Sequence, residues 1–131
     1  MKEYAVRLKK GEDLYNYIKD YCIKNDIKAG VILSGVGCLS EAKMRDAGGV
    51  NIQSLNEPLE ICGLMGTVSK ERLHIHIALA KEDLSVVGGH MVPGCIVNTT
   101  CELVILAFDR YEFSKEFDQN TGYNELLIKE I

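Results

Sequence analysis

The sequence predicts an α/β (α+β) fold that is built on a largely antiparallel, mixed β-sheet with one main amphipathic helix. Short apolar or alternating segments, separated by turn residues, occupy most of the 131 residues. Only residues 12–24 repeat their apolar side chains with the helical period. Because short turns connect many of the strand segments, neighbouring strands are expected to run antiparallel.

The N-terminal part of the chain changes from a strand pattern to a helix pattern. Residues 3–8 alternate between apolar and polar side chains, which is typical of a half-buried strand. Within residues 12–24 the apolar side chains recur at spacings of three and four, so they share one helical face. Glu12 and Asp13 suit the positive end of the helix dipole. This helix is expected to pack its apolar face against the sheet.

Glycines and polar turns divide the rest of the chain into strands. Residues 59–68 are interrupted by Gly63 and Gly66, where a β-bulge or a close backbone approach is expected. Residues 103–108 form a continuous apolar run that is typical of a central strand. The expected strands are residues 29–37, 40–46, 50–55, 59–68, 73–79, 95–108 and 126–128, with a hairpin turn at 47–49.

Size and composition limit the classes of protein to which the chain can belong. Its length is that of one domain, residues 1–131, which can bury a core without disulfides. No apolar run approaches ~18 residues, so no membrane span is expected. The N-terminus lacks the apolar core of a signal peptide. Together with five scattered cysteines, this predicts a cytoplasmic protein with reduced thiols, in which Cys62, Cys95 and Cys101 fill the core.

The net charge of −4 bears on nucleic-acid binding. Neutralisation of phosphates supplies most non-specific affinity for DNA, and it requires a basic stripe. Lys9-Lys10 is the one adjacent basic pair, and acidic residues are interleaved almost everywhere else. Direct nucleic-acid binding by the isolated domain is therefore disfavoured, although an oligomer can gather a local basic patch.

All three histidines lie between residues 74 and 90. His74 and His76 stand two residues apart in an alternating segment, so in a strand they point to the same face. His90 follows Gly88-Gly89, which lets the backbone approach closely on a flexible segment. Three imidazole nitrogens are the usual complement of an open metal site, and zinc is the first expectation, with iron, nickel or copper as alternatives. The competing interpretation is that one or two of these histidines are ordinary core or surface residues.

Three further charged residues are candidates for a site. Glu60 and Glu102 are each embedded in an otherwise apolar strand, so they are candidates for a catalytic acid or base or for a hydrogen-bonding support of a metal ligand. A charge at the edge of a strand or a structural salt bridge explains them equally well. Arg110 either meets an anionic ligand or caps the sheet.

Four motifs with this order and spacing resemble the PPC (plants and prokaryotes conserved) domain. They are residues 59–67 (LEICGLMGT), 73–76 (LHIH), 88–90 (GGH) and 99–105 (TTCELVI). The resemblance spans nearly the whole chain and implies an α/β fold with a largely antiparallel sheet, assembled as a homotrimer. In plants, this domain follows DNA-binding AT-hook motifs and mediates self-association and contacts with transcription factors.

This chain departs from the plant members of the family in two ways. It has no Arg-Gly-Arg-Pro hook, so it resembles a prokaryotic stand-alone member. Residues 57–62 keep only Glu60 and Ile61 of the plant interaction motif Gly-Arg-Phe-Glu-Ile-Leu. Both departures weaken a DNA-binding interpretation.

The fold implied by this resemblance is also similar to that of acetolactate decarboxylase. In that zinc enzyme an H-x-H pair and a third histidine hold the metal, and these map onto His74, His76 and His90. This likeness in fold favours a metal site and says little about a substrate.

We therefore expect a cytoplasmic, homotrimeric PPC-domain protein with a three-histidine metal site and a regulatory or ligand-binding role. Its expected partners are further copies of itself, other proteins or a small anionic ligand. The alternative is a small zinc-dependent lyase or hydrolase, in which Glu60 or Glu102 moves the proton. A third interpretation is a DNA-associated architectural protein.

Overall fold

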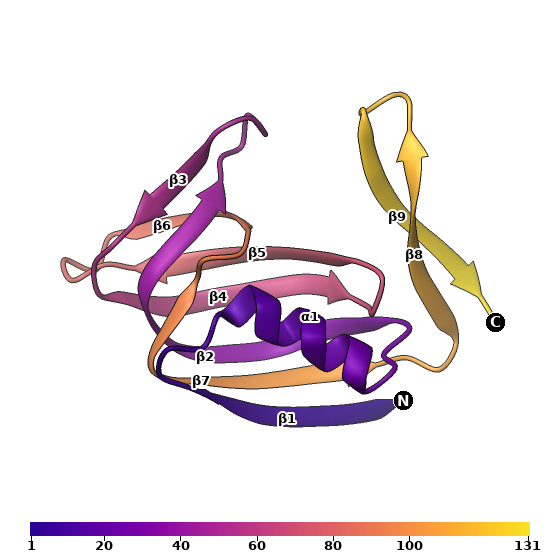
Figure 1. Ribbon diagram of the computed structural model, residues 1–131, viewed down its shortest axis with the longest axis horizontal. Coiled ribbons are helices and arrows are strands. Elements are labelled where there is room, and N and C mark those ends of the chain that lie inside the picture. Colours follow the sequence, from indigo (N-terminus) through magenta and orange to yellow (C-terminus); the bar gives the residue numbers. More distant parts are fainter.

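A bent antiparallel sheet of seven strands carries the helix of the protein across one of its faces (Figure 1). The computed structural model describes residues 1–131. Two further strands form a separate hairpin that projects away from the sheet. The elements are β1 (Lys2–Lys9), α1 (Leu14–Lys24), β2 (Gly30–Arg45), β3 (Ile52–Leu55), β4 (Leu59–Val68), β5 (Leu73–Ala80), β6 (Val86–Met91), β7 (Ile96–Ala107), β8 (Tyr111–Asp118) and β9 (Tyr123–Glu130).

The predicted fold class is confirmed, and every strand pair is antiparallel. Three details differ from the prediction. The segment around Gly88 and Gly89, expected to be flexible, is the strand β6. The segments expected at 29–37 and 40–46 join into the one long strand β2, which absorbs its glycines in irregular pairing. The C-terminal strand is longer than expected and pairs with β8, which the sequence did not predict.

Strand β2 organises the sheet because it has neighbours along both of its edges. The strand order is β1-β7-β2-β4-β5-β6, and the C-terminal part of β2 also pairs with β3 and β6. The path β2-β4-β5-β6 therefore returns to β2. This closure places Arg45, at the end of β2, directly opposite His90 of β6.

Helix α1 seals the core on one face of the sheet. Asp13 caps its N-terminus, because the Asp13 carboxylate accepts a hydrogen bond from the Asn16 backbone at 3.0 Å. Leu14, Ile18 and Cys22 point inward and are fully buried. They join one apolar cluster with the inward side chains of the sheet, as the helical period predicted.

The opposite face of the sheet is open and partly apolar. Leu33, Val36 and Met65 point away from the core and expose 63%, 56% and 69% of their surface. Nothing within the chain covers these three side chains. Soluble monomers rarely expose a large contiguous apolar patch to water. This open face, defined by Leu33, Val36 and Met65, lies on the same side of the sheet as His76, which pairs with Met65.

The cysteine prediction is confirmed for two residues and wrong for one. Cys95 and Cys101 are buried in the core, whereas Cys62 is exposed. Cys62 lies where the pairing of β4 with β5 skips a register between Ile61 and Gly63, so the alternation that was expected to turn it inward is broken there. All five cysteines are free thiols.

No helix of the structure is long and apolar enough to cross a membrane.

Candidate metal centre

Two strands bring the three histidines together. His74 and His76 point to the same side of β5, opposite the buried Ile75 and Ile77. His90 on β6 is the direct register partner of His76. The rings lie 4.9 to 5.7 Å apart between centroids. One potential ligand nitrogen from each imidazole lies within 4.8 Å of the others. The spacing of two residues therefore does place His74 and His76 side by side, as the sequence predicts.

Glycines allow β6 to reach this position. A Cβ atom on Gly88 would lie 2.7 Å from the Ile77 carbonyl oxygen, and one on Gly89 would lie 2.9 Å from that of Arg45. Real side chains do not approach backbone atoms so closely, so both positions require glycine. The glycines belong to a regular strand and not to the flexible segment that the sequence suggested. Their role is to let β6 fit between β5 and the end of β2.

The surroundings favour neutral imidazoles. Burial lowers the pKa of His90 to about 4, and the Arg45 guanidinium adds to this effect. Burial also lowers the pKa of His74, and the Arg72 guanidinium contributes in the same direction. Both rings are thus uncharged at pH 7. Neutral imidazole is the form that binds metals, because its second nitrogen keeps a free lone pair.

The donor set fits a zinc ion. Tetrahedral coordination at ~2.0–2.1 Å per bond places ligand nitrogens about 3.3 Å apart. The ligand nitrogens lie up to 4.8 Å apart here. Small rotations of the side chains would shorten these separations to about the tetrahedral value. His76 is exposed, so the cluster is accessible from solvent. Three nitrogen donors leave one coordination position for water or another ligand, which is the arrangement of open sites.

The structure does not bring Glu60 or Glu102 to the histidines. Glu60 pairs with Ala80, four residues beyond His76 on β5, and it lines a different depression with Lys81 and Glu82. Glu102 lies on β7 opposite Arg7, and strands β2 and β4 separate β7 from the histidine strand β5. Neither lines a cavity that contains a histidine. The two carboxylates that the lyase or hydrolase interpretation used as acid or base therefore lie away from the histidine cluster.

Arg110 also lies away from the cluster. Its Nε donates a hydrogen bond to the Glu130 carboxylate at 2.7 Å, across the base of the hairpin β8–β9. This pair is solvent-exposed, so it belongs to the surface of the hairpin. Arg110 does not line a cavity with the histidines.

Four residues beside the histidines were not predicted: Arg45, Arg72, Tyr123 and Glu125. Arg72 stands two residues before His74, so the same alternation that pairs His74 with His76 signals it. Arg45 arrives through the closure of the sheet. Tyr123 covers Arg45, with the guanidinium carbon 5.6 Å from the ring centroid. Glu125 faces Arg72, at 3.8 Å between carboxylate oxygen and guanidinium nitrogen.

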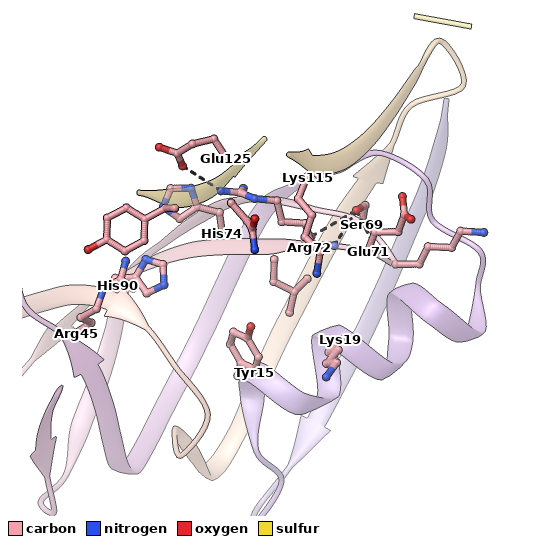
Figure 2. A pocket seen from close by; sticks show the side chains of 14 residues that line it. Tyr15, Lys19, Arg45, Ser69, Glu71, Arg72, His74, His90, Lys115 and Glu125 are labelled. Carbon is pink, nitrogen blue, oxygen red and sulfur yellow. Dashed lines mark hydrogen bonds and ion pairs between the residues drawn. The ribbon is translucent and has the colours of Figure 1, made fainter. Parts of the chain in front are cut away.

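Three cavities open beside the cluster, and the two that contain His90 are the larger ones. One, of about 550 Å³, lies between helix α1 and the hairpin β8–β9 and contains His74 and His90 at one end (Figure 2). The other, of about 510 Å³, is bordered by the turn at residues 46–49 and contains all three histidines. A ligand can thus reach the cluster from two sides.

Residues 1–109 match the family model of the Plants and Prokaryotes Conserved (PCC) domain. The chain belongs to this family. The resemblance that the four motifs suggested is therefore confirmed. The hairpin β8–β9, which forms one wall of the larger cavity, follows the matched residues.

Among curated proteins, the chain is similar to the bifunctional protein GlmU of Synechococcus sp. (strain JA-3-3Ab). The two are 37% identical over all 131 residues, which make up 21% of that protein. The chain thus spans about a fifth of the length of the curated relatives that it matches.

Two solved structures show close similarity over nearly the whole chain. A hypothetical protein from Salmonella cholerae-suis (Salmonella enterica) is 33% identical with a TM-score of 0.95, covering 98% of this chain and 94% of that one. A protein from Archaeoglobus fulgidus that is described as metal-containing is 31% identical with a TM-score of 0.82, covering 97% and 94%.

The expected likeness to acetolactate decarboxylase extends to the fold alone. A Staphylococcus aureus protein described as similar to that enzyme has a TM-score of 0.52 at 12% identity. It covers 83% of this chain and 54% of that one. Such a distant match says nothing about chemistry.

Proposed function

We propose that the protein is a metal-binding module in which His74, His76 and His90 hold one divalent cation. The observation that carries this proposal is the convergence of one nitrogen from each ring within 4.8 Å. Zinc is the first candidate because it prefers imidazole ligands and tolerates an open coordination position. Iron, nickel and copper also accept imidazole. The description of the Archaeoglobus relative as metal-containing supports the proposal.

A bound metal would act on this fold in two ways. It would join β5 to β6 through side chains, and a ligand that binds only the folded state stabilises that state by mass action. As a Lewis acid, it would also attract an oxygen-bearing ligand to its free position. His90 is the residue that makes the connection between the strands, because the other two ligands both lie on β5.

The protein is further proposed to assemble as a homotrimer through its open face. Leu33, Val36 and Met65 are exposed there, and burying each such side chain contributes roughly 1.5–3 kcal/mol. A second copy is the occupant we favour, since the family resemblance implies a trimer. His76 lies beside Met65, so the metal site would stand near the interface between protomers.

The role we propose for this assembly is regulatory. The module would bind a metal and a ligand, and this binding would change its contacts with other proteins. The similarity to one fifth of a longer bifunctional protein supports a modular role, because the same domain accompanies other segments there. Direct contact with DNA is a weaker candidate. The chain carries a net charge of −4, and Lys9-Lys10 is its one adjacent basic pair.

Calorimetric titration with zinc tests the metal proposal. The full chain, freed of metal by a chelator, is expected to bind one zinc ion per protomer. His90→Ala removes one of three ligands and should weaken binding by at least about tenfold. Glu60→Gln is the matched control, because Glu60 lies outside the cluster, and its zinc affinity should equal that of the unmodified protein. Equal affinities for the His90→Ala variant and the unmodified protein would overturn the proposal.

A further inference from the structure

The larger cavity beside the histidines is strongly cationic, although the whole chain is acidic. Two carboxylates, Glu71 and Glu125, line it together with five cationic side chains. The neutral rings of His74 and His90 add no net charge of either sign. A local excess of positive charge attracts anions, and the partly enclosed wall strengthens that attraction. The cationic residues are Lys19, Arg45, Lys70, Arg72 and Lys115.

One nitrogen in each of two guanidinium groups of this cavity lacks a hydrogen-bond partner. The Nε atom of Arg45 and the Nη1 atom of Arg72 are buried and make no hydrogen bond. The side chain of Arg72 is only 13% exposed, and its single ion-pair partner, Glu125, stays 3.8 Å away, beyond hydrogen-bonding distance. Buried polar groups in native proteins are nearly always paired, and an unpaired buried charge is costly. These two donors therefore indicate an anionic ligand.

The fold places the two arginines on either side of the histidine cluster. Arg45 is the register partner of His90 on β6. Arg72 immediately precedes β5 and shares the parity of His74, so it extends along the same side of that strand. Figure 2 shows the side chain of Arg72 reaching toward Glu125 above His74, with Arg45 beyond His90. A ligand held by these guanidiniums would lie next to the imidazoles.

The hairpin β8–β9 supplies the wall that faces the arginines. Tyr123 packs over the guanidinium of Arg45 and restricts its position. Glu125 points at Arg72, and Lys115 lies beside it on β8 (Figure 2). A carboxylate of the protein thus already stands near the position that an anionic ligand would take. Because the Arg72–Glu125 contact is long, a ligand oxygen that approaches more closely can replace it.

We propose that this cavity binds a small molecule that carries a carboxylate or phosphate group. Arg72 recognises the oxyanion, Arg45 and Lys115 add positive charge to the cavity, and the ligand displaces Glu125 from Arg72. Guanidinium groups suit this task because their paired N–H donors match two oxygens of one oxyanion. A cavity of about 550 Å³ lies within the usual size of small-molecule sites. The inference rests on the proposed metal site only in that a bound cation would strengthen the attraction.

Calorimetric titration of the full chain with inorganic phosphate, and separately with malonate, tests the proposal. Each probe is titrated into protein without metal and into protein loaded with zinc. At least one probe is expected to bind in one of the two metal states. Arg72→Ala should weaken that binding by at least about tenfold. Glu125→Gln should strengthen it several-fold, because the competing carboxylate is gone. A preference for phosphate or for malonate identifies which of the two groups the cavity recognises.

Arg110→Ala is the matched control, since Arg110 also faces a glutamate but lies at the base of the hairpin and does not line the cavity. It should leave the affinity of the probe unchanged. Arg72→Lys, which keeps the charge and loses the paired donors, serves if Arg72→Ala fails to fold, and it should bind more weakly than the unmodified protein. The proposal is overturned if neither probe binds in either metal state, or if Arg110→Ala weakens binding as much as the Arg72 variants. If the proposed metal site is wrong, the zinc titration reveals this separately, because no zinc binds.

Discussion

At the scale of single residues, the hydroxyl of Ser69 organises the turn that presents Arg72 to the larger cavity. The Ser69 Oγ donates a hydrogen bond to the Phe113 carbonyl oxygen at 2.7 Å. It accepts hydrogen bonds from the backbone N–H groups of Glu71 and Arg72 at 3.2 and 3.1 Å. Ser69 is 2% exposed, so water does not replace these bonds. One atom thereby ties the turn between β4 and β5 to strand β8.

Replacing Ser69 by alanine is expected to lower the free energy of unfolding by about 1–3 kcal/mol, because buried hydrogen-bonding groups lose their partner. Urea denaturation followed by circular dichroism measures the change. Ser85→Ala is the control, since Ser85 is exposed and its hydroxyl bonds only to the carboxylate of Asp83. If both variants lose the same stability, Ser69 does not have the role described here.

The predictability of the site residues follows from how far apart in sequence their contacts lie. His74 and His76 were predictable because strand alternation is local, and Arg72 was open to the same argument. Arg45 was not, because its position beside His90 depends on the pairing of two distant strands. Glu60 and Glu102 were candidates because they are carboxylates in apolar strands. That local pattern does not reveal where in the sheet each strand lies, so it could not show that both residues are distant from the histidines.

At the scale of elements, strand β6 decides whether the histidines meet. It lies between β5 and the end of β2, and its two glycines leave no room for a Cβ. Any displacement of β6 moves His90 away from His74 and His76. The metal site therefore depends on backbone packing as much as on its ligands.

Gly88→Ala is expected to weaken zinc binding by at least about tenfold and to lower the free energy of unfolding by about 1–3 kcal/mol. The added Cβ would lie 2.7 Å from the Ile77 carbonyl oxygen and push β6 outward. Zinc titration and denaturation measure the two effects. Gly48→Ala is the control, because its Cβ meets nothing closer than 3.4 Å. Unchanged zinc affinity in Gly88→Ala would show that β6 does not need this close packing.

The elements themselves were largely predictable, since alternation and turn residues are local signals. The prediction for β4 matches the structure from Leu59 to Val68. Three strands escaped it for physical reasons, and one of them is β6, whose glycines suggested a flexible segment. The glycines of β2 resemble breaks but are accommodated as irregular pairings, and β8 is too charged to be recognised without its partner β9.

At the scale of the whole molecule, two surfaces remain without a partner within the chain. One is the open face defined by Leu33, Val36 and Met65. The other is the hairpin β8–β9, which projects from the sheet (Figure 1). It exposes apolar side chains such as Phe117 and Ile128. Both surfaces suit association with further copies of the chain, and neither could be recognised from strand patterns alone, because alternation does not reveal which face stays uncovered.

Leu33→Glu is expected to dissociate the proposed trimer, because it places a charge on the open face that the proposed interface would bury. Light scattering coupled to size-exclusion chromatography should give three times the 14.6 kDa mass of one chain for the unmodified protein and a smaller mass for the variant. Ile23→Glu, on the exposed side of α1, is the control and should stay trimeric. A monomeric unmodified protein would contradict the proposed assembly.

Elemental analysis of the protein purified without a histidine tag, beside a His74→Ala/His76→Ala double variant, shows whether the three histidines hold a metal ion. Close to one divalent metal ion per chain is expected in the unmodified protein and none in the variant, because a single imidazole holds a cation poorly. Absence of metal from both proteins, even after incubation with divalent ions, would contradict the account and leave the three histidines without a metal-binding role.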